Sequence, residues 1–274
     1  MTECNHDCSS CAANCGSRTQ PQDFSIKANE NSAVKKVIGI VSGKGGVGKS
    51  LVTSLLACAS QRAGLKTAVL DGDITGPSIA QSFGLNDRLY STETAIIPAY
   101  SSTGIKIVST NLMLDDPAQP VVWRGAILSG VVKQFFSETD WGEVDLMFVD
   151  LPPGTGDVPL TVFQSIPLDG IIIVTTPQQL VRIIVEKAVN MARMMNIPVL
   201  GLIENMSYVE CDNCGNKMYI FGKSHAEELC KDQGLDLLAQ IPINTALTEA
   251  VDKGEIESYP VSYLDDVVKK LAAE

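Results

Sequence analysis

An eight-residue segment near the start of the chain has the residue types and spacing to bind phosphate groups. It reads Gly-Lys-Gly-Gly-Val-Gly-Lys-Ser and matches the pattern G-x-x-x-x-G-K-S/T. Its glycines let backbone N–H groups converge on phosphate oxygens, because no Cβ stands in the way. Lys49 would contact the β- and γ-phosphates of ATP, and the Ser50 hydroxyl would bind Mg²⁺. The predicted nucleotide-binding residues of this segment are Gly43, Lys44, Gly45, Gly46, Val47, Gly48, Lys49 and Ser50.

Lys44 is a second cation inside the same segment, at a position where the pattern makes no demand. Its ammonium could fold back on the nucleotide of its own protomer, or it could reach a nucleotide held by a neighbouring protomer. We therefore count Lys44 together with Lys49 among the predicted catalytic residues.

Three aspartates follow apolar segments that read as strands, and ligands of open α/β sheets bind beyond the carboxyl ends of the strands. Asp150 precedes Leu-Pro-Pro-Gly and is the predicted Walker B acid for Mg²⁺. Asp71 and Asp73 are two residues apart and would share a face. We predict that Asp71 helps to bind the metal and that Asp73 orients the attacking water. The alternative is that these aspartates begin turns or cap helices.

The elements that must position these residues alternate along the chain between short β-branched segments and longer helical ones. This alternation predicts a single α/β domain over residues 34–274, with a mostly parallel sheet and helices on both faces. The polar residues 1–33 are expected to form a flexible arm. Strands are predicted at 37–42, 67–70, 144–149, 170–175, 199–203 and 237–241, and a hairpin or meander at 95–108. Helices are predicted at 49–63, 125–136, 178–195, 224–233, 245–253 and 262–273.

Charge and hydropathy exclude several classes of partner. The chain has 21 basic and 32 acidic residues, a net charge of −11, and no basic stripe. We therefore expect no binding to nucleic acid or to an anionic membrane. No segment approaches the roughly 20 consecutive apolar residues that span a bilayer. The first 16 residues lack the basic and apolar regions of a secretory signal, so we expect a cytoplasmic protein.

Two groups of cysteines suit metal or redox chemistry. Cys211-x-x-Cys214 supplies two thiolates, whereas an iron–sulfur cluster or a structural zinc ion takes four. A symmetric dimer would complete the set by bringing two such loops together. Other possibilities are a redox dithiol, a zinc half-site shared with the arm, or thiols without metal. Cys58 and Cys230 are predicted to be core residues.

The second group, Cys4, Cys8, Cys11 and Cys15, lies in the arm. On one helix the first and last of these would be roughly 16 Å apart, too far for one compact cluster. Their polar neighbours favour a loop, which could wrap around a single metal site. Spacing does not separate zinc from a 4Fe–4S cluster, and we favour the cluster.

The phosphate segment with Lys44, the Asp71-x-Asp73 pair and the segment that begins at Asp150 together resemble the deviant-Walker P-loop ATPases, the class of MinD, ParA and the nitrogenase iron protein. Two further segments, 72–78 (Gly-Asp-Ile-Thr-Gly-Pro-Ser) and 204–208 (Glu-Asn-Met-Ser-Tyr), narrow the match. Together with Cys211-x-x-Cys214, they resemble the Mrp/ApbC iron–sulfur carrier group, which includes the eukaryotic nucleotide-binding protein 35 kDa scaffold. The resemblance covers roughly residues 35–260.

The resemblance implies a homodimer that assembles a 4Fe–4S cluster and transfers it to apo-proteins, coupled to ATP binding and slow, Mg²⁺-dependent hydrolysis. Lys44 would contact the nucleotide of the partner protomer, Asp73 would be the switch I acid, and Asn205 would contact adenine. Cys211 and Cys214 would hold a bridging cluster with the same pair of the second protomer. The arm departs from the scaffold, whose amino-terminal cysteines are more widely spaced.

Two other functions compete with the carrier. A MinD- or ParA-like positioning ATPase would need a basic amphipathic carboxyl-terminal helix or a basic face. Residues 261–274 contain three acidic residues against two lysines, so this signal is missing. The other alternative is a nucleotide-regulated adaptor whose cysteines hold structural zinc.

Overall fold

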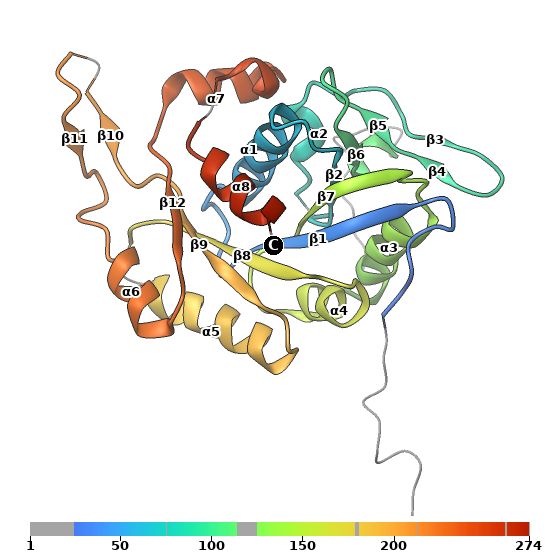
Figure 1. Ribbon diagram of the computed structural model, residues 1–274, viewed down its shortest axis with the longest axis horizontal. Helices are drawn as coiled ribbons and strands as arrows, with labels where there is room; N and C mark the ends of the chain where they lie inside the picture. Colours follow the sequence, from blue (N-terminus) through green and yellow to red (C-terminus); the bar gives the residue numbers. More distant parts are fainter. Residues whose placement is uncertain are drawn as a thin grey trace, which may run out of the picture.

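The longest strand, β1 (Ala33–Ser42), lies inside the main sheet of the computed structural model and leads directly into the phosphate segment (Figure 1). The first residues of β1 alternate between exposed and half-buried, and the last six are buried. This change marks where the strand passes from the edge of the molecule into its centre, since a strand buried on both faces reads as a continuous apolar run. The structure describes residues 25–74, 76–113, 125–178, 181–211, 213–260 and 262–273.

Eight strands form the main sheet in the order β12-β9-β8-β1-β7-β2-β6-β5. Neighbouring strands are parallel, except that β5 and β6 pair antiparallel. This confirms the predicted mostly parallel sheet. The strands after β1 are β2 (Thr67–Asp71), β5 (Ala99–Tyr100), β6 (Lys106–Val108), β7 (Glu143–Asp150), β8 (Gly170–Thr175), β9 (Val199–Glu204) and β12 (Leu237–Gln240).

Helices cover both faces of this sheet, as predicted (Figure 1). One face carries α1 (Lys49–Arg62), α2 (Ile79–Ser82), α7 (Thr245–Asp252) and α8 (Asp265–Ala273). The other face carries α3 (Gly125–Glu138), α4 (Asp157–Ser165), α5 (Val181–Met194) and α6 (Ala226–Gln233). Short 3₁₀ turns lie at Thr110–Leu112 and Ile256–Ser258.

Helix α1 is buried on nearly all sides, because it packs against the sheet and is also contacted by α8. Leu55 and Leu56 are completely buried, and each such side chain contributes about 1.5–3 kcal/mol by leaving water. The helix ends before Gly64, which has a φ of 82°. Glycine adopts this left-handed conformation without steric cost, and it terminates the helix as predicted.

Among the described residues, two small hairpins lie outside the main sheet, and the sequence did not predict either of them. The first pairs β3 (Tyr90–Ser91) with β4 (Ile96–Ile97). The second pairs β10 (Val209–Glu210) with β11 (Lys217–Met218), and it projects from the β12 edge of the sheet (Figure 1). Strands of two residues are too short for a periodic pattern, so hydrophobic alternation could not have revealed them.

The segment from 25 to 33, which the sequence analysis placed in the arm, packs on the domain. Ile26 and Ala28 contact the core, and the Ile26 amide donates to the Ser165 carbonyl. The rest of the predicted arm, with its four cysteines, lies outside the described residues. Within the described part of the chain, no helix is long and apolar enough to cross a membrane.

The sheet order places the phosphate segment in a crevice. Helix α1 follows β1 on one face, whereas α5 follows the neighbouring strand β8 on the opposite face. Connections that diverge from adjacent strands open a crevice at their carboxyl ends, which is where α/β proteins bind ligands.

Candidate functional site

The phosphate loop, residues 43–50, runs from the end of β1 to the first residues of α1. Gly46 and Gly48 have φ values of 77° and 76°, which favour glycine. Gly48 also needs the absence of a side chain, because a Cβ there would lie 2.2 Å from Nδ2 of Asn205. That Nδ2 donates a hydrogen bond of 2.9 Å to the carbonyl oxygen of Val47. Asn205, which directly follows β9, therefore holds the phosphate loop at Val47.

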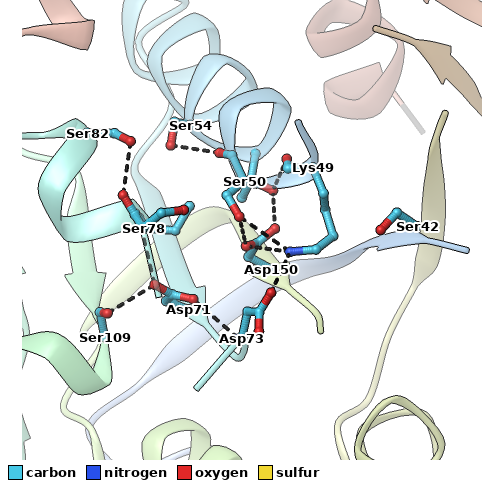
Figure 2. A network of polar contacts seen from close by, with 12 residues as sticks. Ser42, Lys49, Ser50, Ser54, Asp71, Asp73, Ser78, Ser82, Ser109 and Asp150 are labelled. Carbon is cyan, nitrogen blue, oxygen red and sulfur yellow. Dashed lines mark hydrogen bonds and ion pairs between the residues drawn. The ribbon is translucent and has the colours of Figure 1, made fainter. Parts of the chain in front are cut away.

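The Asp150 carboxylate accepts contacts from three side chains in the first turns of α1, and Figure 2 shows those of Lys49 and Ser50. Its Oδ2 lies 2.7 Å from Nζ of Lys49 and 2.6 Å from Oγ of Ser50. Its Oδ1 accepts from Oγ1 of Thr53 at 2.7 Å. The carboxylate is completely buried and Lys49 is only 5% exposed. The residues predicted to bind phosphate and Mg²⁺ therefore lie together around one carboxylate.

Thr53 is a contact that the sequence analysis missed. Its spacing from Lys49 and Ser50 places it on the same side of α1, because residues three and four apart on a helix are neighbours. A search along the helix for hydroxyl groups near the loop would have found it.

Asp73 and Asp71 belong to the same polar network but have different surroundings (Figure 2). Asp73 is 14% exposed and its Oδ2 lies 3.7 Å from Nζ of Lys49, at the edge of the phosphate-loop pocket. Asp71 is completely buried and accepts hydrogen bonds from Oγ of Ser109 at 3.0 Å and from the Ile79 amide at 3.4 Å. Burial, together with the nearby Asp150 carboxylate, raises the pKa of Asp71 to about 7, although Lys49 acts in the opposite direction.

The contacts of Asp71 differ from those expected of a metal ligand. Its side chain holds the backbone at the start of α2, and its Oδ1 accepts from the Asp73 amide at 3.3 Å. It thereby positions Asp73, which lines the pocket. Direct or water-mediated metal binding by Asp71 stays a prediction.

The pocket above the loop has a volume of about 320 Å³. Lys44 lines it, and its Nζ donates to Oε1 of Gln178, just after β8. The sequence contained no signal for Gln178. Asn205, the predicted adenine contact, is 1% exposed and holds Val47. Its contact with a base stays a prediction, whereas its support of the loop is present in this structure.

The cysteine hairpin, residues 207–224, carries the Cys-x-x-Cys pair at its tip. Cys211 is half-buried and Cys214 is exposed. The chain turns tightly between them: the Gly215 amide donates to the Cys211 carbonyl at 2.8 Å, and the Cys211 amide donates to the Asn216 carbonyl at 3.0 Å. In the described part of the chain, no group of three or more His, Cys, Asp or Glu side chains is arranged to hold a metal ion. One hairpin thus supplies two thiols to any shared site.

The cysteines outside the hairpin divide into two kinds. Cys58 and Cys230 are 3% and 4% exposed in α1 and α6, which confirms that they are core residues. Burial raises the pKa of Cys58 to about 12 and that of Cys230 to about 11. Cys4, Cys8, Cys11 and Cys15 lie outside the described residues, so their predicted metal site stays a prediction.

With this geometry established, comparison with known proteins decides the family. The model of the NUBPL iron-transfer P-loop NTPases, of the ParA group, matches residues 33–274. The chain belongs to this family. The match covers the sheet, the phosphate loop and the cysteine hairpin, and it confirms the resemblance drawn from the motifs.

Two relatives of this family are similar over most of their length. The iron-sulfur cluster carrier protein of Clostridium perfringens is 45% identical over 234 residues, which cover 82% of this chain and 82% of that protein. The protein of the same name from Methanocaldococcus jannaschii is 43% identical over 264 residues, covering 93% of this chain and 90% of that protein.

Solved structures agree with the fold. A nucleotide-binding protein from Archaeoglobus fulgidus, in complex with ADP, has a TM-score of 0.77 and 39% identity, covering 85% of this chain and 91% of that chain. A chain of the MinC:MinD complex of Aquifex aeolicus has a TM-score of 0.63 and 20% identity, with coverage of 87% and 96%. The second likeness shows the fold alone, a P-loop NTPase domain.

Proposed function

We propose that this chain is an ATP-binding iron–sulfur cluster carrier, which assembles a 4Fe–4S cluster between two copies and transfers it to apo-proteins. The observation that carries the proposal is that one domain presents both a complete phosphate loop and a projecting hairpin with an exposed cysteine. The names of the two relatives and the family description support the same function. We place this activity in the cytoplasm, where reducing conditions keep such thiols available.

The residues around the loop fit ATP and magnesium. Glycines at positive φ, the start of α1 and the Lys49 ammonium suit phosphate groups. The Ser50 hydroxyl and the Asp150 carboxylate, already 2.6 Å apart, are oxygen donors of the kind that Mg²⁺ prefers. When bound there, Mg²⁺ would neutralise charge on the phosphate oxygens. Lys44 is proposed to contact the nucleotide of the partner protomer.

Slow hydrolysis is the expected activity of this site. Asp73 is the carboxylate that lines the pocket among the described residues, and it is the proposed group that orients the attacking water. Its Oδ2 lies 3.7 Å from Nζ of Lys49, the group proposed to contact the β- and γ-phosphates. We therefore expect Asp73→Asn to reduce turnover while nucleotide binding persists. Phosphate release measured with and without magnesium tests this expectation, and an unchanged rate would remove Asp73 from the catalytic role.

The cluster is the cargo of this protein, and it needs a second copy. Four thiolates are required, and one hairpin supplies two. A two-fold axis near the tip would bring Cys211 and Cys214 of both copies together, because the same surface meets itself in such a dimer. Exposure of Cys214 would leave the cargo accessible to thiols of a recipient. A second cluster is proposed for the four cysteines of the arm.

The test is anaerobic reconstitution with iron and sulfide, followed by metal and sulfide analysis and by transfer to an apo-ferredoxin-type acceptor. In a background in which the four arm cysteines are alanine, we expect about four irons per dimer, held by four hairpin thiolates. Cys211→Ala with Cys214→Ala should lose this iron and keep nucleotide binding. Cys230→Ala, a buried cysteine of α6, is the matched control and should keep both. Zinc without iron, or full iron in the hairpin variant, would contradict the carrier function.

A further inference from the structure

One buried carboxylate holds both ends of the cysteine hairpin. Glu204, the last residue of β9, is 1% exposed and accepts hydrogen bonds from Oγ of Ser207 at 2.6 Å and from Oγ of Ser224 at 2.8 Å. Nε2 of Gln240 donates a third bond at 2.9 Å. Ser207 is where the chain enters the hairpin and Ser224 is where it leaves. Removal of the acceptor would leave the buried Ser207 hydroxyl without this bond, which is costly, and would detach the half-buried Ser224 side chain at the other end.

The next residue holds the phosphate loop. Asn205 is also 1% exposed, and its side chain donates to the Val47 carbonyl at 2.9 Å, while its backbone amide donates to the Thr175 carbonyl at 2.8 Å. A displacement of the loop at Val47 therefore acts on the Asn205 side chain through this bond, and Asn205 is covalently joined to Glu204. Glu204 and Asn205 are neighbours in the chain, although one contacts the cysteine hairpin and the other contacts the phosphate loop, two segments that are far apart in the sequence.

The backbone at this junction is in a rare conformation. Met206 has a φ of 56°, which few residues other than glycine adopt. Such a residue persists only where surrounding contacts determine it, and here the contacts of Glu204, Asn205 and Ser207 do so. Strained residues of this kind are concentrated at functional and switching segments.

A cavity of about 260 Å³ beside Glu204 leaves room for movement. Thr175 and Thr176 line it, and their hydroxyls are buried without a hydrogen-bond partner in the described structure. His225 and Ala226, at the start of α6 and directly after Ser224, also line it. Gln178, which accepts the bond from Lys44, also lines it. The exit of the hairpin thus borders open space rather than a close-packed core.

From these contacts we propose that Glu204 and Asn205 are positioning residues that couple nucleotide binding at the phosphate loop to the position of the cysteine hairpin. Asn205 senses the loop through Val47, and Glu204 passes the displacement to Ser207 and Ser224. The coupling rests on the proposed function only in its purpose, the control of cluster loading and release. The mechanical link itself needs no cluster.

The test therefore uses the full-length protein without iron. The rate at which iodoacetamide alkylates Cys214 is measured by peptide mass spectrometry, with and without a non-hydrolysable ATP analogue and magnesium. The measured quantity is the ratio of the two alkylation rates of Cys214, the larger divided by the smaller. Couplings between sites correspond to changes of about 5- to 150-fold, so we expect this ratio to be at least five in wild type. Glu204→Gln, which retains the shape but replaces one accepting oxygen with an amide that donates, should bring the ratio of the two alkylation rates closer to one while the analogue still binds.

Ser224→Ala removes one hairpin contact at the margin of the cavity and serves if Glu204→Gln does not fold; it should also lower the ratio. Ser224→Thr keeps the hydroxyl and should restore it. Glu228→Gln is the matched control, because Glu228 lines the same cavity on α6 and contacts His225 rather than the hairpin ends. Its ratio should equal that of wild type.

Three results would overturn the proposal. The first is a ratio near one in the wild-type protein, and the second is an unchanged ratio in both Glu204→Gln and Ser224→Ala. The third is that the variants with a ratio near one have also lost nucleotide-dependent dimerisation in sedimentation. The last would show that contact between copies, and not the link, protects the thiol. If the ratio depends on Glu204 but reconstitution gives no iron, the link stands and the carrier function fails. If iron binds and the ratio does not depend on Glu204, the carrier function stands and the link fails.

Discussion

Nζ of Lys49 lies 2.7 Å from Oδ2 of Asp150, and both groups are almost completely buried. The lysine predicted to contact phosphate and the aspartate predicted to bind magnesium therefore compensate each other's charge in this structure. A buried carboxylate without a cation or donors is costly, so this pair contributes to folding as well as to binding.

Lys49→Ala is expected to abolish ATP binding and also to destabilise the nucleotide-free protein. Removal of one partner of a buried ion pair costs about 3 kcal/mol or more, although Ser50 and Thr53 still donate to Asp150. Urea unfolding without nucleotide measures the change. Lys44→Ala, in the same loop but bonded to Gln178, should change the unfolding free energy much less. Equal stability of Lys49→Ala and wild type would show that the pair does not support the fold.

Gly48→Ala should destabilise the nucleotide-free protein more than Gly46→Ala. Both glycines have a φ near 77°, which costs about 1–2 kcal/mol for an L-residue. A Cβ at Gly46 meets nothing within 4 Å, whereas one at Gly48 collides with Asn205 and breaks its bond to Val47, which costs about 1 kcal/mol more. Thermal or urea unfolding compares the two variants. A double variant with Asn205→Ala should cancel part of the difference, and strict additivity would contradict the contact.

Alkylation of the native protein should distinguish exposed from buried thiols. Because burial raises the pKa values of Cys58 and Cys230 to about 12 and about 11, their thiolate fractions at pH 8 are roughly 10⁻⁴ and 10⁻³. Cys214 is exposed and should react within minutes, while the two core thiols should react only in denaturant. Peptide mass spectrometry at pH 8 reads each site separately. Rapid native labelling of Cys58 would mean that α1 opens locally.

Stability should depend on pH through Glu257, which joins the 3₁₀ turn near the carboxyl end to the turn between β5 and β6. Burial by itself would raise the pKa of Glu257, but donors from Ser101, Ser102 and Thr103 outweigh it and lower the pKa. The stabilisation is therefore present above the unfolded-state pKa, near 4.5, and is lost as the pH falls through the folded-state value.

Glu257→Gln should consequently be less stable than wild type at pH 7 by about 1 kcal/mol, after allowance for solvent screening of a half-exposed group. The difference should shrink below about pH 4.5 and vanish once the carboxyl is protonated in both states. Unfolding curves between pH 3 and pH 7 provide the measurement. Glu249→Gln, at an exposed position of α7 near Lys253, is the control and should show almost no difference. A constant difference across this range would exclude the ionised form as the cause.

Much of the nucleotide site was determined by the sequence alone, because its information is local. The glycine pattern, a preceding apolar strand and a following helix specify the path of residues 43–50 within one short segment. The place of Asp150 beside the loop could be predicted from its position at the end of an apolar strand, because parallel strands end at the same edge of the sheet. The positions of the main helices followed from periodicity and glycine caps for the same reason.

Only the tertiary structure decided how distant segments meet. The sheet order, with β9 beside β8 and β8 beside β1, brings Asn205 under Val47, which is 158 residues away in the chain. The same packing buries Asp71 and gathers Ser207, Ser224 and Gln240 on Glu204. No periodicity encodes such partners, because a buried polar side chain takes whichever donor the packing of other elements brings within hydrogen-bond distance.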